Sequence, residues 1–292
     1  MGISMTTASY AYYPGCTLHA TAKEYDASAR AVCEKMGIGL EELKDWTCCG
    51  ASSAHTTNEM LAIALPARDL LAAEKMGKPI AVACALCFNR LKVTEHELAS
   101  DKSKLETVRS LVGSDYANTA EVVHLLQILY DRRSSIAVSR PLKGLKVASY
   151  YGCMLVRPHE ITQFDDPEDP QMMDKLMVAL GAQALEWDFK TACCGASLPL
   201  TRRDILLKLS HRILAQAQQF GADCLAVACP MCQFNLDMYQ QAINKEYGEK
   251  INLPILYFTQ LAGLAMGLSL TQLHLDKHIV DPVPVLRKKG LA

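Results

Sequence analysis

The sequence lacks an excess of charge of either sign. Its 292 residues carry 30 Lys and Arg against 31 Asp and Glu, which gives a formal net charge of -1. The sequence contains no basic tract and no segment in which arginines alternate with aromatic residues. Binding to nucleic acid depends on basic side chains that neutralise phosphates. We therefore expect no nucleic acid among the partners of this chain.

We also expect no secretory signal, since no basic segment followed by an apolar stretch occurs in residues 1–13. Residues 251–275 contain no Asp, Glu, Lys or Arg, but Pro254 and several polar side chains interrupt them. A membrane span needs about 20 predominantly apolar residues. We expect no membrane span, a cytoplasmic location, and a short strand at 256–258 followed by a buried helix.

What the sequence does have is a duplicated cysteine frame that takes up ten of its 12 cysteines. Each frame consists of a single Cys, an adjacent pair and a Cys-x-x-Cys. The intervals are 31 and 34 residues in the first frame and 39 and 34 in the second. The pentapeptide Cys-Cys-Gly-Ala-Ser occurs at 48–52 and again at 193–197. The repeat predicts two halves, 1–140 and 141–292, with two equivalent metal centres.

Each half alternates strands with helices, which predicts an α/β fold made of two pseudo-symmetric strand-helix halves. The expected strands are 8–14, 80–83, 145–151, 224–228 and 256–258. The expected helices are 20–36, 57–76, 88–98, 171–180, 203–220 and one that begins within 229–232. Residues 101–109, partly helical, and 131–141, between the halves, are expected as surface connections. The cysteines follow strands, and ligands of α/β proteins collect at the carboxyl ends of strands.

The number of thiols in each half favours a polynuclear metal site. A Cys-x-x-Cys alone fits a redox dithiol, half of a zinc site or half of an iron-sulfur site. A structural zinc ion needs four ligands, whereas each half offers five cysteines. Adjacent cysteines diverge, so they reach different irons of a cluster more easily than two corners of one tetrahedron. Zinc sites and disulfides remain the alternatives to an iron-sulfur centre.

The doubled frame resembles the cysteine-rich CCG repeat in the B-type subunit of heterodisulfide reductase over nearly the whole chain. The resemblance implies that each half holds a noncubane 4Fe-4S cluster on five cysteines, and that a small disulfide substrate is cleaved reductively in a cavity between the two clusters. The implied ligands are Cys16, Cys48, Cys49, Cys84 and Cys87 in the first half and Cys153, Cys193, Cys194, Cys229 and Cys232 in the second.

The same resemblance implies partners, because the chain has no Cys-x-x-Cys-x-x-Cys run of a ferredoxin module. Electrons would come from a ferredoxin-like C-type subunit linked to a flavoprotein A-type subunit. Relatives can act on another thiol or run in reverse. The frame is also found in iron-sulfur electron-transfer subunits of systems that oxidise 2-hydroxy acids or succinate. A zinc-stabilised interaction protein is the alternative of a different kind.

Several residues near the ligands are candidates for further roles. Arg157 and Arg202 are our preferred pair for holding an anionic group of a substrate, since arginine binds such groups well. His55, Arg90, His159 and Arg203 are further candidates for lining a cavity, and solvated surface charge is the competing interpretation for all six. We expect close backbone approach at four glycines, burial of two extra cysteines, and packing by three aromatic residues. These are Gly15, Gly50, Gly152 and Gly195, then Cys33 and Cys224, then Trp46, Tyr150 and Trp187.

Overall fold

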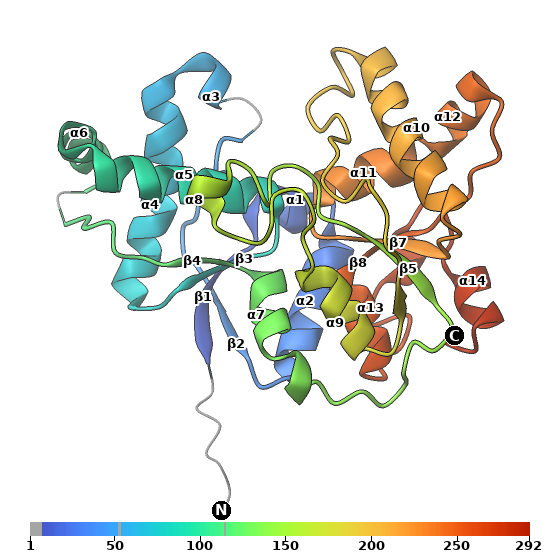
Figure 1. The fold of residues 1–292 in the computed structure, drawn as a ribbon. Coiled ribbons are helices and arrows are strands. Elements are labelled where there is room, and N and C mark those ends of the chain that lie inside the picture. Colours follow the sequence, from blue (N-terminus) through green and yellow to red (C-terminus); the bar gives the residue numbers. More distant parts are fainter. Residues whose placement is uncertain (1–7, 52–53, 114) are drawn as a thin grey trace, which may run out of the picture.

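The computed structural model describes residues 8–51, 54–113 and 115–292. Residues 1–7, part of the segment without a signal pattern, and Ser52 of the first pentapeptide lie outside these ranges. The described chain forms two four-stranded parallel sheets with helices around them (Figure 1). The predicted α/β class with two related halves is confirmed.

The first sheet has the strand order β2-β1-β3-β4. Its strands are β1 (Ser9–Tyr13), β2 (Gly39–Glu42), β3 (Ile80–Val82) and β4 (Val122–His124). Its helices are α1 (Gly15–Ala20), α2 (Lys23–Lys35), α3 (Ala54–Thr57), α4 (Glu59–Met76), α5 (Ala85–Ser100), α6 (Lys102–Val112) and α7 (Leu125–Asp131). The 3-10 turn η1 (Arg133–Ser135) begins the connection to the second sheet.

The second sheet repeats this order as β6-β5-β7-β8. Its strands are β5 (Lys146–Tyr150), β6 (Gln183–Ala184), β7 (Cys224–Val227) and β8 (Ile255–Tyr257). Its helices are α8 (His159–Thr162), α9 (Met172–Ala179), α10 (Arg203–Gln219), α11 (Pro230–Met238), α12 (Gln240–Tyr247) and α13 (Phe258–Ala265). The 3-10 turn η2 (Leu275–Lys277) and α14 (Val283–Lys288) complete the chain.

The central strands are short and wholly buried, as continuously apolar segments of a parallel sheet should be. Every residue of β3 and β7 is buried. Local signals set the helix ends: the Asn58 side chain accepts from the Leu61 N–H at the start of α4, and Gly77 ends that helix at φ 62°. Pro230 occupies the first turn of α11, where a missing N–H costs nothing.

The two halves pack against each other through pairs of helices, one helix of each pair from each half. α2 packs against α13, and α7 packs against α9 (Figure 1). The Ser28 and Thr259 hydroxyls are 2.7 Å apart across the α2–α13 contact. One continuous cluster of buried side chains extends through both sheets. Helices α4 and α6 lie at one outer end of the molecule, and α10 and α12 lie at the other (Figure 1).

Several expected elements need correction. The helix expected over 20–36 is α2, which begins three residues later, at Lys23, and the short helix α1 that precedes it was not expected. The helix expected from residue 88 begins at Ala85, and the connection expected at 101–109 is a full helix, α6. Strands β2, β4 and β6 were not expected, because they are short or carry polar, partly exposed residues. In the part of the chain that the structure describes, no helix has the length and apolar character to cross a membrane.

Candidate metal centres and adjoining cavities

The fold brings the cysteines of each half to one edge of its sheet. Cys16 follows β1 and Cys84 follows β3, and these strands are neighbours whose chain connections run to opposite sides. Ligands of open parallel sheets bind at such a switch point, beyond the carboxyl ends of the strands. Cys153 after β5 and Cys229 after β7 occupy the corresponding positions. The adjacent pairs reach the same edges from the loops that follow β2 and β6.

In the first half the five thiols form a continuous series of contacts. The Sγ atoms of Cys16 and Cys48 are 3.7 Å apart, and those of Cys49 and Cys87 are 3.3 Å apart. Cys48 also contacts Cys49, and Cys84 contacts Cys87. The contacts run from Cys16 through Cys48, Cys49 and Cys87 to Cys84. Among the described residues, no group of three or more His, Cys, Asp or Glu forms a ligand shell for a single metal ion.

The second half shows the same pairing. The Sγ atoms of Cys194 and Cys232 are 3.5 Å apart, Cys229 contacts Cys232, and Cys153 contacts Cys193. The two series meet at Cys84 and Cys229, because the Cys229 thiol raises the pKa of Cys84 and the Cys84 thiol lowers the pKa of Cys229. The remaining two cysteines, Cys33 and Cys224, are buried elsewhere as expected. All 12 cysteines are free.

Clustering shifts the pKa values of these thiols in opposite directions. Hydrogen bonds from Cys48 and Cys87 lower the pKa of Cys49 to about 4, and a hydrogen bond from Cys153 lowers the pKa of Cys193 to about 5. The hydrogen bond to Cys48, together with burial, raises the pKa of Cys16. In each half the clustering therefore favours deprotonation of one thiol, and the thiolate is the form in which cysteine binds metals.

Matching tyrosines fix the adjacent cysteine pairs. The Tyr13 hydroxyl donates to the Thr47 carbonyl at 2.7 Å, directly before the first pair. The Tyr150 hydroxyl donates to the Ala192 carbonyl at 2.6 Å, directly before the second. Trp46 lies edge-on to Tyr13, and the Trp187 Nε1–H donates to the Ser149 carbonyl. These aromatic residues pack beside the cysteines, as expected.

Glycines allow the chain to pass close to the thiols. Gly15 and Gly152 have φ values of 69° and 70°, and a Cβ on either would lie 3.1 Å from Cys87 Sγ or Cys232 Sγ. Gly50 has φ 72°, and its Cβ would lie 2.6 Å from the Ala54 Cβ. Gly195 has φ 81° and faces Leu206. Positive φ combined with close neighbours makes glycine the residue that fits these positions.

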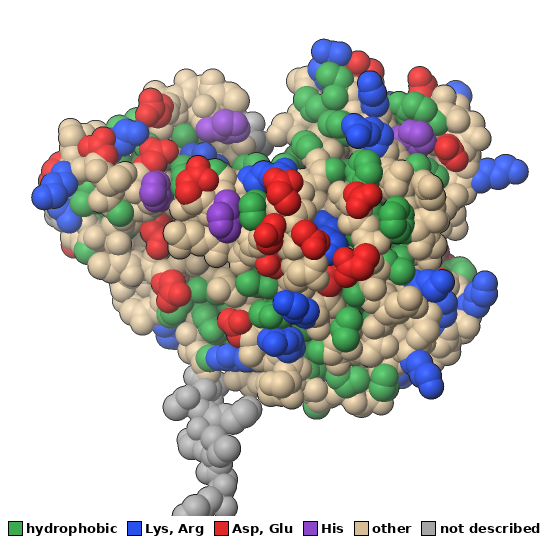
Figure 2. All heavy atoms as spheres, viewed as in Figure 1, with side chains coloured by type: hydrophobic (Ala, Val, Ile, Leu, Met, Phe, Trp, Pro, Cys, Tyr) green, Lys and Arg blue, Asp and Glu red, His purple; other side chains and the backbone are tan. Residues whose placement is uncertain are grey.

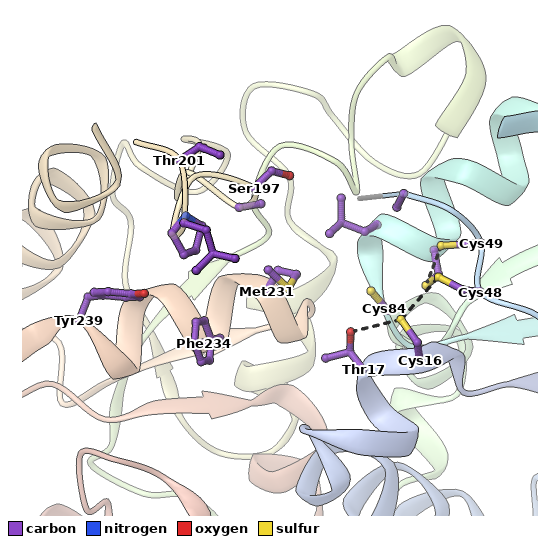
Figure 3. A pocket seen from close by; sticks show the side chains of 16 residues that line it. Cys16, Thr17, Cys48, Cys49, Cys84, Ser197, Thr201, Met231, Phe234 and Tyr239 are labelled. Carbon is purple, nitrogen blue, oxygen red and sulfur yellow. Dashed lines mark hydrogen bonds between the residues drawn. The ribbon is translucent and has the colours of Figure 1, made fainter. Parts of the chain in front are cut away.

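Two cavities open onto the cysteines, and each is completed by the opposite half. The first, of about 510 Å³, joins Cys16, Cys48, Cys49, Cys84 and Cys87 to a wall from the second half. Figure 3 shows four of these cysteines facing Met231, Phe234 and Tyr239 on and after α11. The segment 196–201 forms the rest of that wall. A notch between the two outer ends of the molecule is visible in the space-filling view (Figure 2).

The second cavity, of about 290 Å³, joins Cys153 and Cys193 to residues of the first half. Leu86, Arg90 and His55 form that opposite wall, from α5 and α3. Both cavities share Ala51, Leu86, Ala196 and Ser197, so they adjoin each other. Among the described lining residues of both, Arg90 is the single Lys or Arg.

The two arginines preferred from the sequence lie outside the lining of both cavities. Arg157 binds Glu168 Oε1 at 2.9 Å and the Pro167 carbonyl at 3.1 Å. Arg202 binds both carboxylate oxygens of Asp204 on the exposed surface. His159 and Arg203 do not line either cavity, whereas His55 and Arg90 do. Arg90 donates to the Ala62 carbonyl at 3.0 Å, and its buried Nε has no hydrogen-bond partner.

Sequence reasoning missed the apolar wall of the first cavity. Met231 is one of the two residues inside the second Cys-x-x-Cys, and Phe234 follows it by three positions along α11. Helical spacing after the Cys-x-x-Cys was the available signal. Leu200 is 98% exposed at the rim, and nothing in its local sequence distinguishes it.

Comparison with known proteins identifies the class to which this arrangement belongs. The family model of the cysteine-rich CCG domain matches residues 10–92 and 147–237. These ranges contain all ten cysteines of the frame. The chain belongs to this cysteine-rich domain family and contains the domain twice.

Among its relatives, the chain is 32% identical to the 8-methylmenaquinol:fumarate reductase membrane anchor subunit of Wolinella succinogenes, over 93% of this chain and 97% of that protein. It is 28% identical to the B-type subunit of the ferredoxin/F420H2-dependent CoB-CoM heterodisulfide reductase of Methanosarcina acetivorans, over 96% and 97%. A hypothetical protein from Helicobacter pylori has the same fold, with a TM-score of 0.77 at 17% identity. That likeness covers 94% of this chain and 52% of the other.

The conformation of Gly50 predicts a specific loss of stability on substitution. In Gly50→Ala the new Cβ would clash with Ala54, and alanine would have to adopt an unfavourable positive φ. In Gly37→Ala, alanine would also have to adopt a positive φ, of 68°, but its Cβ would meet no atom within 4 Å. We expect Gly37→Ala to cost about 1 kcal/mol and Gly50→Ala about 3 kcal/mol. Urea denaturation followed by circular dichroism measures both. Equal losses in the two variants would show that Ala54 moves aside without cost.

Asp69 predicts a pH dependence of stability. It accepts from the Thr47 N–H at 2.8 Å, next to the cysteine pair, and burial raises its pKa from 3.8 to about 7. Between pH 4 and 7 the folded state therefore keeps a proton that the unfolded state releases. Stability relative to Asp69→Asn should fall as pH rises through this window, by about 1 kcal/mol per pH unit, and level off above pH 7. Urea midpoints that run parallel for the two proteins would contradict this.

Proposed function

We propose that the chain is the catalytic subunit of a heterodisulfide reductase-like complex, which cleaves a disulfide reductively or forms it in reverse. The observation that carries the proposal is the meeting of two five-cysteine series at Cys84 and Cys229, with a cavity on each series. A disulfide bond takes up two electrons and two protons to give two thiols. Two adjacent redox centres provide one electron each.

The residues present fit iron-sulfur clusters, and we propose that each half, 1–140 and 141–292, holds one noncubane 4Fe-4S cluster. The ligands would be Cys16, Cys48, Cys49, Cys84 and Cys87 in one half and Cys153, Cys193, Cys194, Cys229 and Cys232 in the other. When bound, such clusters supply reversible one-electron chemistry. A series of soft thiolates, free of a single-ion shell among the described residues, suits several irons better than one zinc.

The cavities favour a substrate with two unlike ends. The first cavity is lined by Met231, Phe234, Leu200 and Pro199, and its described lining contains no Lys, Arg, His, Asp or Glu. This wall suits an apolar group. The second cavity is lined by Arg90, whose guanidinium can donate to a carboxylate, sulfonate or phosphate. An asymmetric disulfide with one apolar and one anionic end fits both.

We also propose that the chain works in the cytoplasm with partner subunits of the ferredoxin-like and flavoprotein kinds. Its 12 free cysteines suit a reducing compartment. Two of the relatives are named as subunits of reductases, which supports assembly with other chains. The partners would deliver the electrons that a disulfide consumes.

A second candidate function is that of an iron-sulfur electron-transfer subunit in a succinate- or fumarate-linked system. The observation in its favour is the 32% identity to one subunit of a menaquinol:fumarate reductase over nearly the full length of both chains. The apolar wall at Met231 and Phe234 is compatible with a quinol near the first site. Under anaerobic conditions, oxidation of reduced dye by a disulfide supports the first function. Oxidation of a menaquinol analogue with no response to disulfides supports the second.

Metal analysis tests the cluster proposal. Protein purified without oxygen should contain about eight irons and about eight acid-labile sulfides per chain. Cys194→Ser should lose about half of the iron, because the ligands of each cluster lie within one half, while Cys33→Ser serves as a control that keeps all of it. Stoichiometric zinc without sulfide would overturn the proposal. Complete loss of iron from a folded Cys194→Ser chain would show that the halves share their ligands.

Arg90 tests the substrate class. Arg90→Gln should raise the Michaelis constant for an anionic disulfide by about 10- to 100-fold, since a charge-assisted contact contributes about 1.5 to 3 kcal/mol. The constant for a neutral disulfide should change little, and iron content should be retained. Arg202→Gln and Arg157→Gln are matched surface controls expected to leave both constants unchanged. If Arg157→Gln or Arg202→Gln raises the Michaelis constant for the anionic disulfide and Arg90→Gln does not, the anion-binding residue is one of the two arginines preferred from the sequence.

A further inference from the structure

Tyr25 joins the backbones that lead into the two Cys-x-x-Cys segments. It lies on α2 and is completely buried. Its hydroxyl donates to the Ala83 carbonyl at 2.7 Å and also lies 3.4 Å from the Ala228 carbonyl. Ala83 precedes Cys84, and Ala228 precedes Cys229. One hydroxyl group therefore connects the two halves at the point where their cysteine series meet.

His124 is a second donor at the same point. Its Nδ1 accepts from the Leu126 N–H at 3.1 Å, so Nε2 carries the proton and donates to the Ala83 carbonyl at 2.9 Å. The ring is completely buried, and burial lowers its pKa to about 4. It is therefore neutral in solution near pH 7. Tyr25 and His124 thus hold the Ala83 carbonyl from two directions.

The corresponding positions of the second half are built differently. His124 pairs with Val82 in the first sheet, as Tyr257 pairs with Val227 in the second. The Tyr25 ring stacks on Tyr257 with centroids 4.0 Å apart, whereas Phe164 lies edge-on to His124 at 5.8 Å. Phe164, which contacts the opposite half through His124 as Tyr25 does through Tyr257, has no hydroxyl that could donate a hydrogen bond.

Within the described ranges, no side chain of the second half donates to the carbonyl of Ala83 or Ala228. Both donors at this junction come from the first half. The asymmetry suggests a role that packing alone does not require, because rings without donors would fill the same space.

We propose that Tyr25 and His124 are positioning residues that set the reduction potentials of the two clusters together. The inference rests on the proposed function, since it needs a metal cluster in each half. Hydrogen bonds and dipoles around an iron-sulfur centre tune its potential. A donor placed against a carbonyl next to a ligand offsets the negative end of that dipole. The more negative, reduced state of the adjacent cluster is then favoured.

The experiment is a redox titration of anaerobically purified protein, monitored by electron paramagnetic resonance. Tyr25→Phe removes the hydroxyl and keeps the stacked ring. His124→Asn keeps a side chain that can cap α7 but loses the donor to Ala83. At a fixed poise, the ratio of reduced to oxidised cluster should fall about fivefold in each variant, the effect of about one hydrogen bond. Tyr116→Phe is the control, because the buried Tyr116 loses one bond, to Asn118 at 2.8 Å, and no cysteine is among the groups that shift its pKa.

The outcomes separate this inference from the proposed function. A wild-type protein without iron overturns both. Iron-loaded Tyr25→Phe and His124→Asn proteins with unshifted potentials overturn the inference alone, and leave the clusters in place. An equal shift in Tyr116→Phe overturns it as well, because the effect would then follow from any buried hydrogen bond. Iron content and circular dichroism of each variant establish that the comparison is between folded, loaded chains.

Discussion

The junction of the two Cys-x-x-Cys segments is the constraint on which the rest of the structure depends. Cys84 follows the end of β3 by two residues, Cys229 follows the end of β7 by two, and the two thiols are close enough to shift each other's pKa. Helices from both halves hold this junction together. α2 packs against α13, and α7 packs against α9. Because the central strands have no exposed residue, a shift of either strand would disturb both cysteine series at once.

This constraint explains why each cavity combines residues of both halves. With the two Cys-x-x-Cys segments side by side, α11 of the second half faces the first cysteine series, and α5 of the first half faces the second. A half folded alone would present its thiols to solvent on that side. The cavities therefore exist only in the assembled chain. Duplication of the frame thus gives two related sites. They differ chemically, because Phe234 lines the first cavity and Arg90 lines the second.

The sequence predicted the parts of the fold that short-range pattern controls. β3 and β7 are continuously apolar, and the cysteine spacing marked the edge of each sheet where the sites lie. β2 contains the exposed Glu41 and Glu42, and β6 has two residues, so neither shows a strand pattern. Arg157 and Arg202 are near cysteines in sequence, but Glu168 and Asp204 hold them elsewhere. Which charge faces a cavity depends on packing between halves, which no local pattern records.

The charge balance at the site links the metal proposal to the role of Arg90. Ten cysteines gather in a largely buried region, and metal binding requires them as thiolates. Burying several negative charges is costly unless cations neutralise them. The described cavity lining contains Arg90 as its single Lys or Arg, far fewer cations than the thiolates need. The metal ions of the proposed clusters would meet that need, and the guanidinium of Arg90 would then be left for the anionic group of the proposed substrate.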